Sequence, residues 1–161
     1  MMPIRHAVTQ ASSLLVAAFL LNWPWEAVHA AAYVESTGSL LYRFRHCLPM
    51  AGTDALWTLA LWLVSAGLVS RADGRRWRLG VVAAFGFITA VVVERVALAQ
   101  GRWTYNDLMP VVPIVDAGLW PVAQMTLLPM LATWLVTRRT GQKSSAVSTT
   151  ADGVGRQEHG E

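Results

Sequence analysis

Four long apolar stretches constrain the fold of this chain more than any other feature of its sequence. They cover about residues 8–28, 51–70, 79–99 and 117–137. Each reaches the roughly 20 helical residues needed to cross about 30 Å of hydrocarbon. A helix satisfies its backbone hydrogen bonds within one segment, as a lipid environment requires. The sequence therefore predicts an all-α fold, a four-helix transmembrane bundle over residues 1–139.

The composition agrees with a membrane protein and excludes several other classes. Of the 161 residues, 54% are hydrophobic and 14% are charged, against roughly 25% charged in an average soluble protein. The net charge of +3 comes from scattered bases, without the basic face that nucleic acids require. The single cysteine, Cys47, excludes an internal disulfide and any CxxC site. We expect the lipid bilayer as a partner, no nucleic acid, no metal and no cofactor.

The distribution of Lys and Arg indicates an orientation. If the N-terminus is inside, the inner segments hold eight of them, not counting Arg156: Arg5, Arg71, Arg75, Arg76, Arg78, Arg138, Arg139 and Lys143. The outer loops hold three: Arg43, Arg45 and Arg102. Because positive charge accumulates on the cytoplasmic side, we predict a multi-pass protein of the bacterial inner membrane with both termini in the cytoplasm. Residues 140–161 lack hydrophobic periodicity, so we expect a disordered cytoplasmic tail there.

The first apolar stretch has a second interpretation as a secretory signal peptide. Arg5, the apolar run 14–21, Pro24 and the triplet Val28-His29-Ala30 fit a signal with a small-residue cleavage site. A single Arg before the run and the Trp25-Glu26 pair are atypical of such signals. Cleavage would leave three spans and an external N-terminus, and this alternative stays open.

Acidic residues gather at the outer ends of the predicted spans. Asp54 lies about 5 Å into the second span and Glu94 about 7.5 Å into the third, at 1.5 Å per residue. A carboxylate in hydrocarbon costs roughly 3 kcal/mol even on a lenient scale, so both should face the bundle interior with a partner. They are the candidate catalytic residues. Glu26 and His29 close the first span; their Glu-x-x-His spacing occurs in di-metal bundles, which need two copies and two further Glu, so we interpret them as binding residues without a metal.

The segment 100–116 is too apolar for an ordinary outer loop, and its two prolines prevent a regular helix. We expect it to lie at the membrane interface and to pack over the helix ends, with its aromatic residues as anchors. It is either a structural plug or a lid over the acidic residues, with Arg102 as their counter-ion or as an anion clamp. Its candidate binding residues are Arg102, Trp103, Tyr105 and Asp107.

Two short runs are the most specific patterns in the chain: Gly101-Arg102-Trp103-x-Tyr105-x-x-x-Met109-Pro110-x-x-Pro113 and Gly118-Leu119-x-Pro121-x-x-Gln124. With Trp25-Glu26, Cys47, Asp54 and Glu94, they resemble a group of small four-helix bacterial membrane proteins that has no assigned activity. The resemblance covers about residues 20–138, and Thr53 stands where the group is expected to have Gly. It implies an uncleaved first span and a functional set of acidic residues, and it implies no reaction.

Two functions from different classes follow from these observations. The first is a non-enzymatic bundle for binding, accessory or assembly work, whose carboxylates form buried contacts. The second is a membrane enzyme that uses Glu94 and Asp54 as general acid and base on a lipid-like or isoprenoid substrate. A topological similarity to small sterol-isomerase-like membrane proteins favours this alternative. Ion or proton conduction is a third possibility, but it needs polar groups across the whole bilayer, and the inner halves of the spans offer mainly Gln10, Ser12, Ser13 and Ser65.

Overall fold

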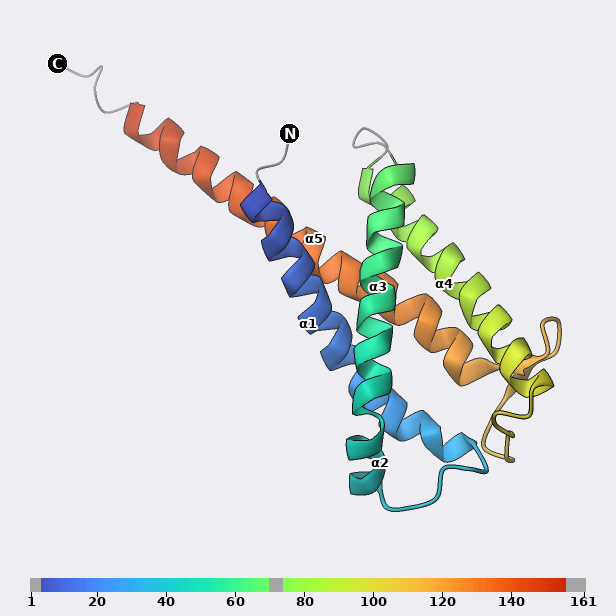
Figure 1. Ribbon diagram of the computed structural model, residues 1–161. Helices are drawn as coiled ribbons and strands as arrows, with labels where there is room; N and C mark the ends of the chain where they lie inside the picture. The colour runs from blue at the N-terminus through green and yellow to red at the C-terminus, as the bar shows by residue number, and fades with distance from the viewer. Residues whose placement is uncertain (1–3, 70–73, 156–161) are drawn as a thin grey trace.

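The computed structural model describes residues 4–69 and 74–155, and this part of the chain is mostly helical (Figure 1). In chain order, its elements are α1 (Ile4–His29), the 3₁₀ helix η1 (Ala30–Ala32), α2 (Leu40–His46), α3 (Leu48–Leu68), α4 (Gly74–Ala99), β1 (Val111–Val112), β2 (Ala117–Gly118) and α5 (Leu119–Gly155). Four segments are long and apolar enough to cross a membrane: Arg5–Ala32, Leu48–Leu68, Gly74–Ala99 and Leu119–Arg138. The four predicted spans are therefore confirmed as helices of membrane-spanning length.

The helix boundaries follow from local sequence. The Ser39 hydroxyl accepts a hydrogen bond from the Tyr42 backbone N–H and caps the start of α2. Pro121 lies in the first turn of α5, where a missing N–H removes no helical hydrogen bond. Pro129 does lie inside α5, and Pro24 inside α1.

The long helices are not packed equally against one another. α3 packs chiefly against α1, α4 packs chiefly against α5, and α1 also contacts α5. α3 and α4 contact each other much less, although they follow one another in the chain. Figure 1 shows why: the two helices lie close together where α3 ends and α4 begins, and they diverge toward the end of the bundle that carries α2.

Small residues bring the helices together. One buried cluster contains Leu14, Ala18, Ala55, Trp62, Ala132 and Val136, from α1, α3 and α5. At Gly86 in α4, an added Cβ would collide with the backbone carbonyl oxygen of Met125 in α5. Such close backbone approach is typical of helix packing in membranes.

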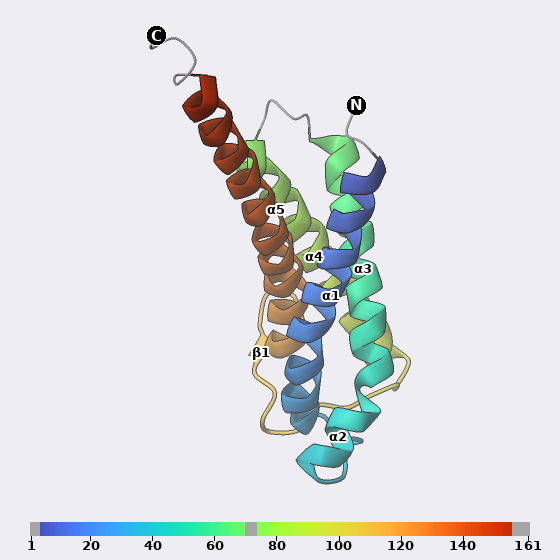
Figure 2. The same cartoon turned by 90° about the vertical axis from the view of Figure 1, so that its left-hand side faces the viewer.

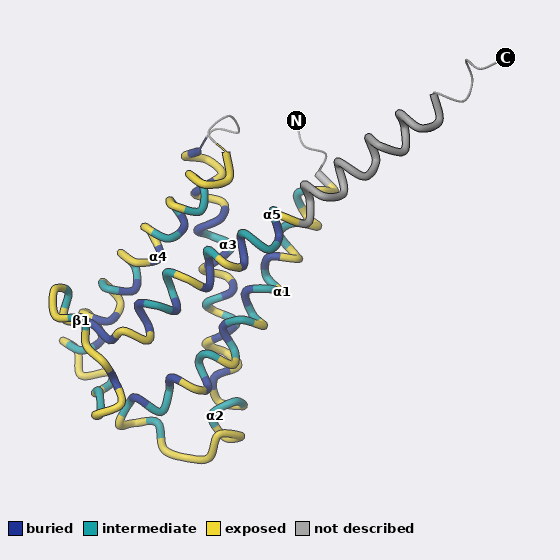
Figure 3. The backbone as a smooth tube through the Cα atoms, turned by 180° about the vertical axis from the view of Figure 1, so that it is seen from behind, coloured by how far each residue is buried: buried dark blue, intermediate teal, exposed yellow. Residues whose placement is uncertain are grey.

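Large apolar side chains cover the outside of the bundle instead of its core. Leu20, Leu63, Ile88 and Val92 each expose more than half of their surface. Figure 3 shows buried residues as stripes along the inward sides of the helices, with exposed residues on the other sides. A bundle that is apolar on its outer surface is what a hydrocarbon surrounding requires.

The segment between α4 and α5 is fastened to the chain that follows α1. Its strands β1 and β2 pair antiparallel, with Val111 opposite Gly118. The Val34 N–H donates to the Thr104 carbonyl at 2.9 Å, and the Asn106 N–H donates to the Ala32 carbonyl at 3.1 Å. These bonds hold the segment across the α2 end of the bundle, which Figure 2 shows from the side.

α5 continues beyond its membrane-length part. The span ends at Arg138, and the backbone continues as helix to Gly155, pointing away from the other helices (Figure 1). Residues 130–155 contain no proline that would interrupt the helix. Residues 140–155 thus extend α5 as helix, and residues 156–161 lie outside the described part of the chain; the disordered cytoplasmic tail stays a prediction.

Candidate functional site

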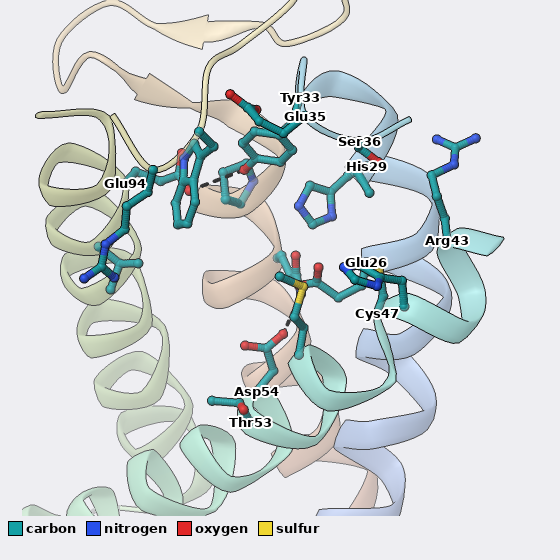
Figure 4. Close-up of a pocket in the computed structure, with 18 of the residues that line it drawn as sticks. Glu26, His29, Tyr33, Glu35, Ser36, Arg43, Cys47, Thr53, Asp54 and Glu94 are labelled. Carbon is teal, nitrogen blue, oxygen red and sulfur yellow. Dashed lines mark hydrogen bonds between the residues drawn. The ribbon is translucent and has the colours of Figure 1, made fainter. Parts of the chain in front are cut away.

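A cavity of about 470 Å³ lies at the α2 end of the bundle, within the size range of small-molecule sites, roughly 300–1,000 Å³. All five helices and both flanking loops contribute to its lining. Figure 4 shows acidic, imidazole and thiol side chains converging on it from different helices. The divergence of α3 from α4 therefore makes room for a polar site at one end of an otherwise apolar bundle.

The Gln124 amide joins two carboxylates from different helices. Its Nε2 lies 2.7 Å from Glu26 Oε1, 3.0 Å from Asp54 Oδ2 and 3.0 Å from Asn22 Oδ1. Gln124 and Asn22 are almost completely buried. An amide nitrogen carries only two hydrogens, so it cannot donate to all three oxygens at once. The arrangement therefore leaves hydrogen-bond acceptor capacity on Glu26 and Asp54, and both of these residues line the cavity.

Glu94 is held by two tyrosines. The Tyr33 hydroxyl donates to Oε1 at 3.4 Å, and the Tyr105 hydroxyl donates to Oε2. The Gly118 backbone N–H donates in turn to the Tyr105 oxygen at 2.8 Å. Burial and the neighbouring Glu94 carboxylate raise the pKa of both hydroxyls above the ordinary value. Both tyrosines therefore stay protonated, and they donate to Glu94, at neutral pH.

His29 occupies the space between these two groups. Only 8% of its surface is exposed, and Figure 4 shows its ring in the cavity between Glu26 on one side and Tyr33 and Glu94 on the other. Its Nδ1 lies 3.1 Å from the Trp25 carbonyl oxygen. Because a carbonyl only accepts, Nδ1 must carry the hydrogen, so Nε2 of the neutral ring keeps its lone pair. Within the described residues, Nε2 has no hydrogen-bond partner.

The structure brings most of the predicted site residues to this one cavity. Its lining includes Glu26, His29, Asp54, Glu94, Arg102 and Trp103. Tyr105 reaches the site through its bond to Glu94. Asp107 is exposed and does not line the cavity; the neighbouring Asn106 is the residue that fastens this loop, through a 2.8 Å bond to the Ala31 carbonyl.

The expected pairing of Glu94 with Arg102 is replaced by another. Arg102 is exposed, and the partners of Glu94 are tyrosine hydroxyls, since the short loop places Tyr105 rather than the Arg102 guanidinium against the carboxylate. Asp54 shares Gln124 with Glu26 and is not paired with Glu94. Arg95, next to Glu94 in the chain, forms an exposed ion pair with Asp116 at 2.5 Å.

Sequence reasoning gave no role to several residues of the site. Asn22, Tyr33 and Gln124 hold or complete the acidic groups, and Arg43 and Cys47 line the cavity. The available signal was the presence of amides in apolar spans, because Asn22 and Gln124 are polar residues that hydrocarbon disfavours. Their partners come from other helices and could not be assigned from spacing.

The described residues include no group of three or more His, Cys, Asp and Glu side chains placed to hold a metal ion. Glu26 and His29 share the cavity. Glu26 accepts a hydrogen bond from the Gln124 amide there, and the His29 ring makes an edge contact with the ring of Tyr33. No protein-family model, curated protein or solved structure matches this chain. The resemblance to small four-helix bacterial membrane proteins stays an expectation, and the function has to be argued from the geometry of the site.

Proposed function

We propose that this is a multi-pass membrane protein whose cavity binds an amphipathic, lipid-like molecule by a head group that donates hydrogen bonds. One observation carries the proposal: Glu26 and Asp54 converge on a single amide nitrogen beside the unpartnered Nε2 of His29. All three groups accept hydrogen bonds and line the same cavity. A hydroxyl or ammonium head group would supply the missing donors.

The charge of the cavity supports the same ligand class. Its lining contains four carboxylates and two guanidinium groups: Glu26, Glu35, Asp54, Glu94, Arg43 and Arg102. The Thr104 backbone N–H donates to Glu35 at 3.0 Å and lowers the pKa of that carboxyl. Carboxyl groups outnumber guanidinium groups in this lining, so it matches a cationic or neutral donor better than an anionic head group.

The topology we propose places this cavity near the external surface of a bacterial inner membrane. The excess of Lys and Arg on the other side of the spans supports cytoplasmic termini. The segment between α4 and α5 would then lie at the external interface. α1 supplies Asn22, Glu26 and His29 to the site, which favours retention of the first span over cleavage as a signal peptide.

Three probes with the same chain test the head-group preference: hexadecylamine, hexadecanol and palmitate. The purified protein in phosphatidylcholine nanodiscs would be unfolded thermally with each. At about a hundredfold excess over Kd, we expect the amine or the alcohol to raise Tm by about 5–10 °C. Palmitate should give no comparable shift. Asp54→Asn should reduce the shift strongly, and the control Asp107→Asn, outside the cavity, should keep it.

Equal shifts with palmitate and with the two donor probes would contradict the proposal. So would an equal loss of the shift in Asp107→Asn and Asp54→Asn, because the probes would then bind elsewhere. The comparison uses the ligand-induced shift of each variant, so a change in the stability of the variant itself does not affect it.

A second candidate, a membrane enzyme, is favoured by the tautomer of His29. A free Nε2 in a buried cavity is suited to accept a proton, and Asp54 and Glu94 are suited to exchange one with a lipid-like or isoprenoid substrate. Membranes containing the protein would be incubated in D2O and their lipids examined by mass spectrometry. Deuterium incorporation that is lost in His29→Gln supports proton transfer, and no incorporation above that of protein-free membranes contradicts it.

A further inference from the structure

We infer that the cavity opens sideways into the bilayer between α3 and α4, and that the ligand is a single-chain amphiphile whose apolar chain leaves through this opening. The inference rests on the proposed function and adds the route and the shape of the ligand. It follows from three observations: the divergence of two helices, the character of the side chains along the gap and the closure of the neighbouring end of the bundle.

The first observation is the packing of α3 and α4. Each packs mainly on a different partner, α1 and α5 respectively, and they diverge toward the α2 end (Figure 1). The cavity occupies the region of divergence, since it is lined by Met50 and Thr53 of α3 and by Val93 of α4.

The second observation is the exposure of apolar side chains at the gap. Met50 exposes 52% of its surface and Val93 44%, although both line the cavity. Both lie inside membrane-length segments, Met50 about 3 Å and Val93 about 9 Å from the nearer end of the segment. In the proposed topology, the part of this surface that points out of the cavity would face lipid chains. The gap is therefore suited to an apolar chain.

The third observation is that the cavity is closed beside Glu94, on the side where the loop after α4 lies. The loop after α4 is bonded to the segment after α1 through Val34 and Asn106, and the ring of Trp103 lies 5.9 Å from that of Tyr33 in an edge contact. A long chain cannot leave through this fastened side without breaking those contacts. The α2 side carries the polar residues Arg43 and His46, which suit a head group better than a chain.

Cys47 provides a native reporter of access, because it lines the cavity and is the only cysteine. Burial and the neighbouring Glu26 carboxylate raise the pKa of its thiol, so labelling is best followed at about pH 8.5, where more thiolate forms. Two maleimides would be compared in nanodiscs by intact mass: N-octadecylmaleimide, which partitions into the bilayer, and the water-soluble N-(2-aminoethyl)maleimide.

Narrowing the gap should slow only the bilayer route. We expect N-octadecylmaleimide to label the wild type readily, and Val93→Trp to slow it about tenfold while leaving the water-soluble reagent within about twofold. The matched control is Val92→Trp, because Val92 is also exposed on α4 but does not line the cavity. On α3, Met50→Trp and its control Leu56→Trp repeat the comparison if Val93→Trp does not fold.

Equal N-octadecylmaleimide rates in Val93→Trp and Val92→Trp, repeated in the α3 pair, would overturn the sideways opening. If hexadecylamine still stabilises the wild type in that case, the ligand class stands and only the route is wrong. If hexadecylamine, hexadecanol and palmitate all fail to stabilise the wild type, the proposed function is wrong, and the assignment of the opening to a ligand chain is overturned with it.

Discussion

At the scale of single residues, the site is organised by neutral hydrogen-bond donors rather than by ion pairs. Glu94 accepts from Tyr33 and Tyr105, and the carboxylates Glu26 and Asp54 surround the Gln124 amide. Neutral donors avoid the desolvation penalty of a buried cation. They also leave the carboxylates able to bind a ligand, because no opposite charge neutralises them.

The partners of Glu94 lead to a prediction that separates tyrosine bonding from ion pairing. Glu94→Gln replaces one acceptor oxygen by an NH₂ group that faces a tyrosine hydroxyl, so we expect a loss of about 1–3 kcal/mol in the free energy of unfolding. Arg102→Gln should change it by less than about 0.5 kcal/mol, as exposed substitutions usually do. Denaturant unfolding of the two single variants and the double variant, in the same detergent, measures these changes in the free energy of unfolding.

The effects of Glu94→Gln and Arg102→Gln should add in the double variant. A double variant that is more stable than Glu94→Gln alone would instead show that Arg102 pairs with Glu94. That result would contradict the contacts described above.

At the scale of elements, the position of α4 depends on its close approach to α5. Gly86 lies against the backbone of Met125, and four residues on, Ala90 is buried in the same interface. α4 can therefore remain against α5 while its contact with α3 is lost toward the cavity. One close helix contact thus helps to set the shape of the site.

Two glycines of α4 allow this contact to be tested. Gly86→Ala places a Cβ against the Met125 carbonyl and should destabilise the protein by about 1–3 kcal/mol. Gly80→Ala is the matched control, because nothing lies within 4 Å of its added Cβ; it should be neutral or stabilising by up to about 1 kcal/mol. Thermal unfolding in nanodiscs would measure both, and equal effects would show that the α4–α5 contact is looser than described.

At the scale of the whole molecule, the described structure has its polar cavity at one end and is apolar around its circumference. The cavity and the fastened loop lie at the α2 end, and large exposed apolar residues surround the helices. This arrangement suits a protein that handles an amphiphile at one surface of a membrane. The proposal requires the α2 end to face outward.

Single cysteines on the exposed surface test this orientation better than Cys47, because access to Cys47 also depends on the cavity in which it lies. In a Cys47→Ala background, Asp107→Cys lies exposed near the α2 end and Arg75→Cys lies exposed at the start of α4. In cells with a permeabilised outer membrane, an impermeant maleimide should label Asp107→Cys, and it should label Arg75→Cys only after lysis. The opposite labelling pattern would reverse the topology and place the cavity at the cytoplasmic surface.

The sequence by itself determined the four spans and the charged residues of the site within them, because span length and hydrophobicity are local properties and a charge in an apolar segment can be seen from the sequence alone. It also identified Glu26, His29, Asp54 and Glu94 as one acidic group with an imidazole, all of which line the cavity. The tertiary structure decided their partners. Tyr33 and Glu94 are 61 residues apart in the chain, and Gln124 and Glu26 are 98 apart, and hydrophobic periodicity does not specify which helix faces meet. The cavity depends on the divergence of α3 from α4, and that divergence results from packing preferences among all four spans, which a single apolar segment does not encode.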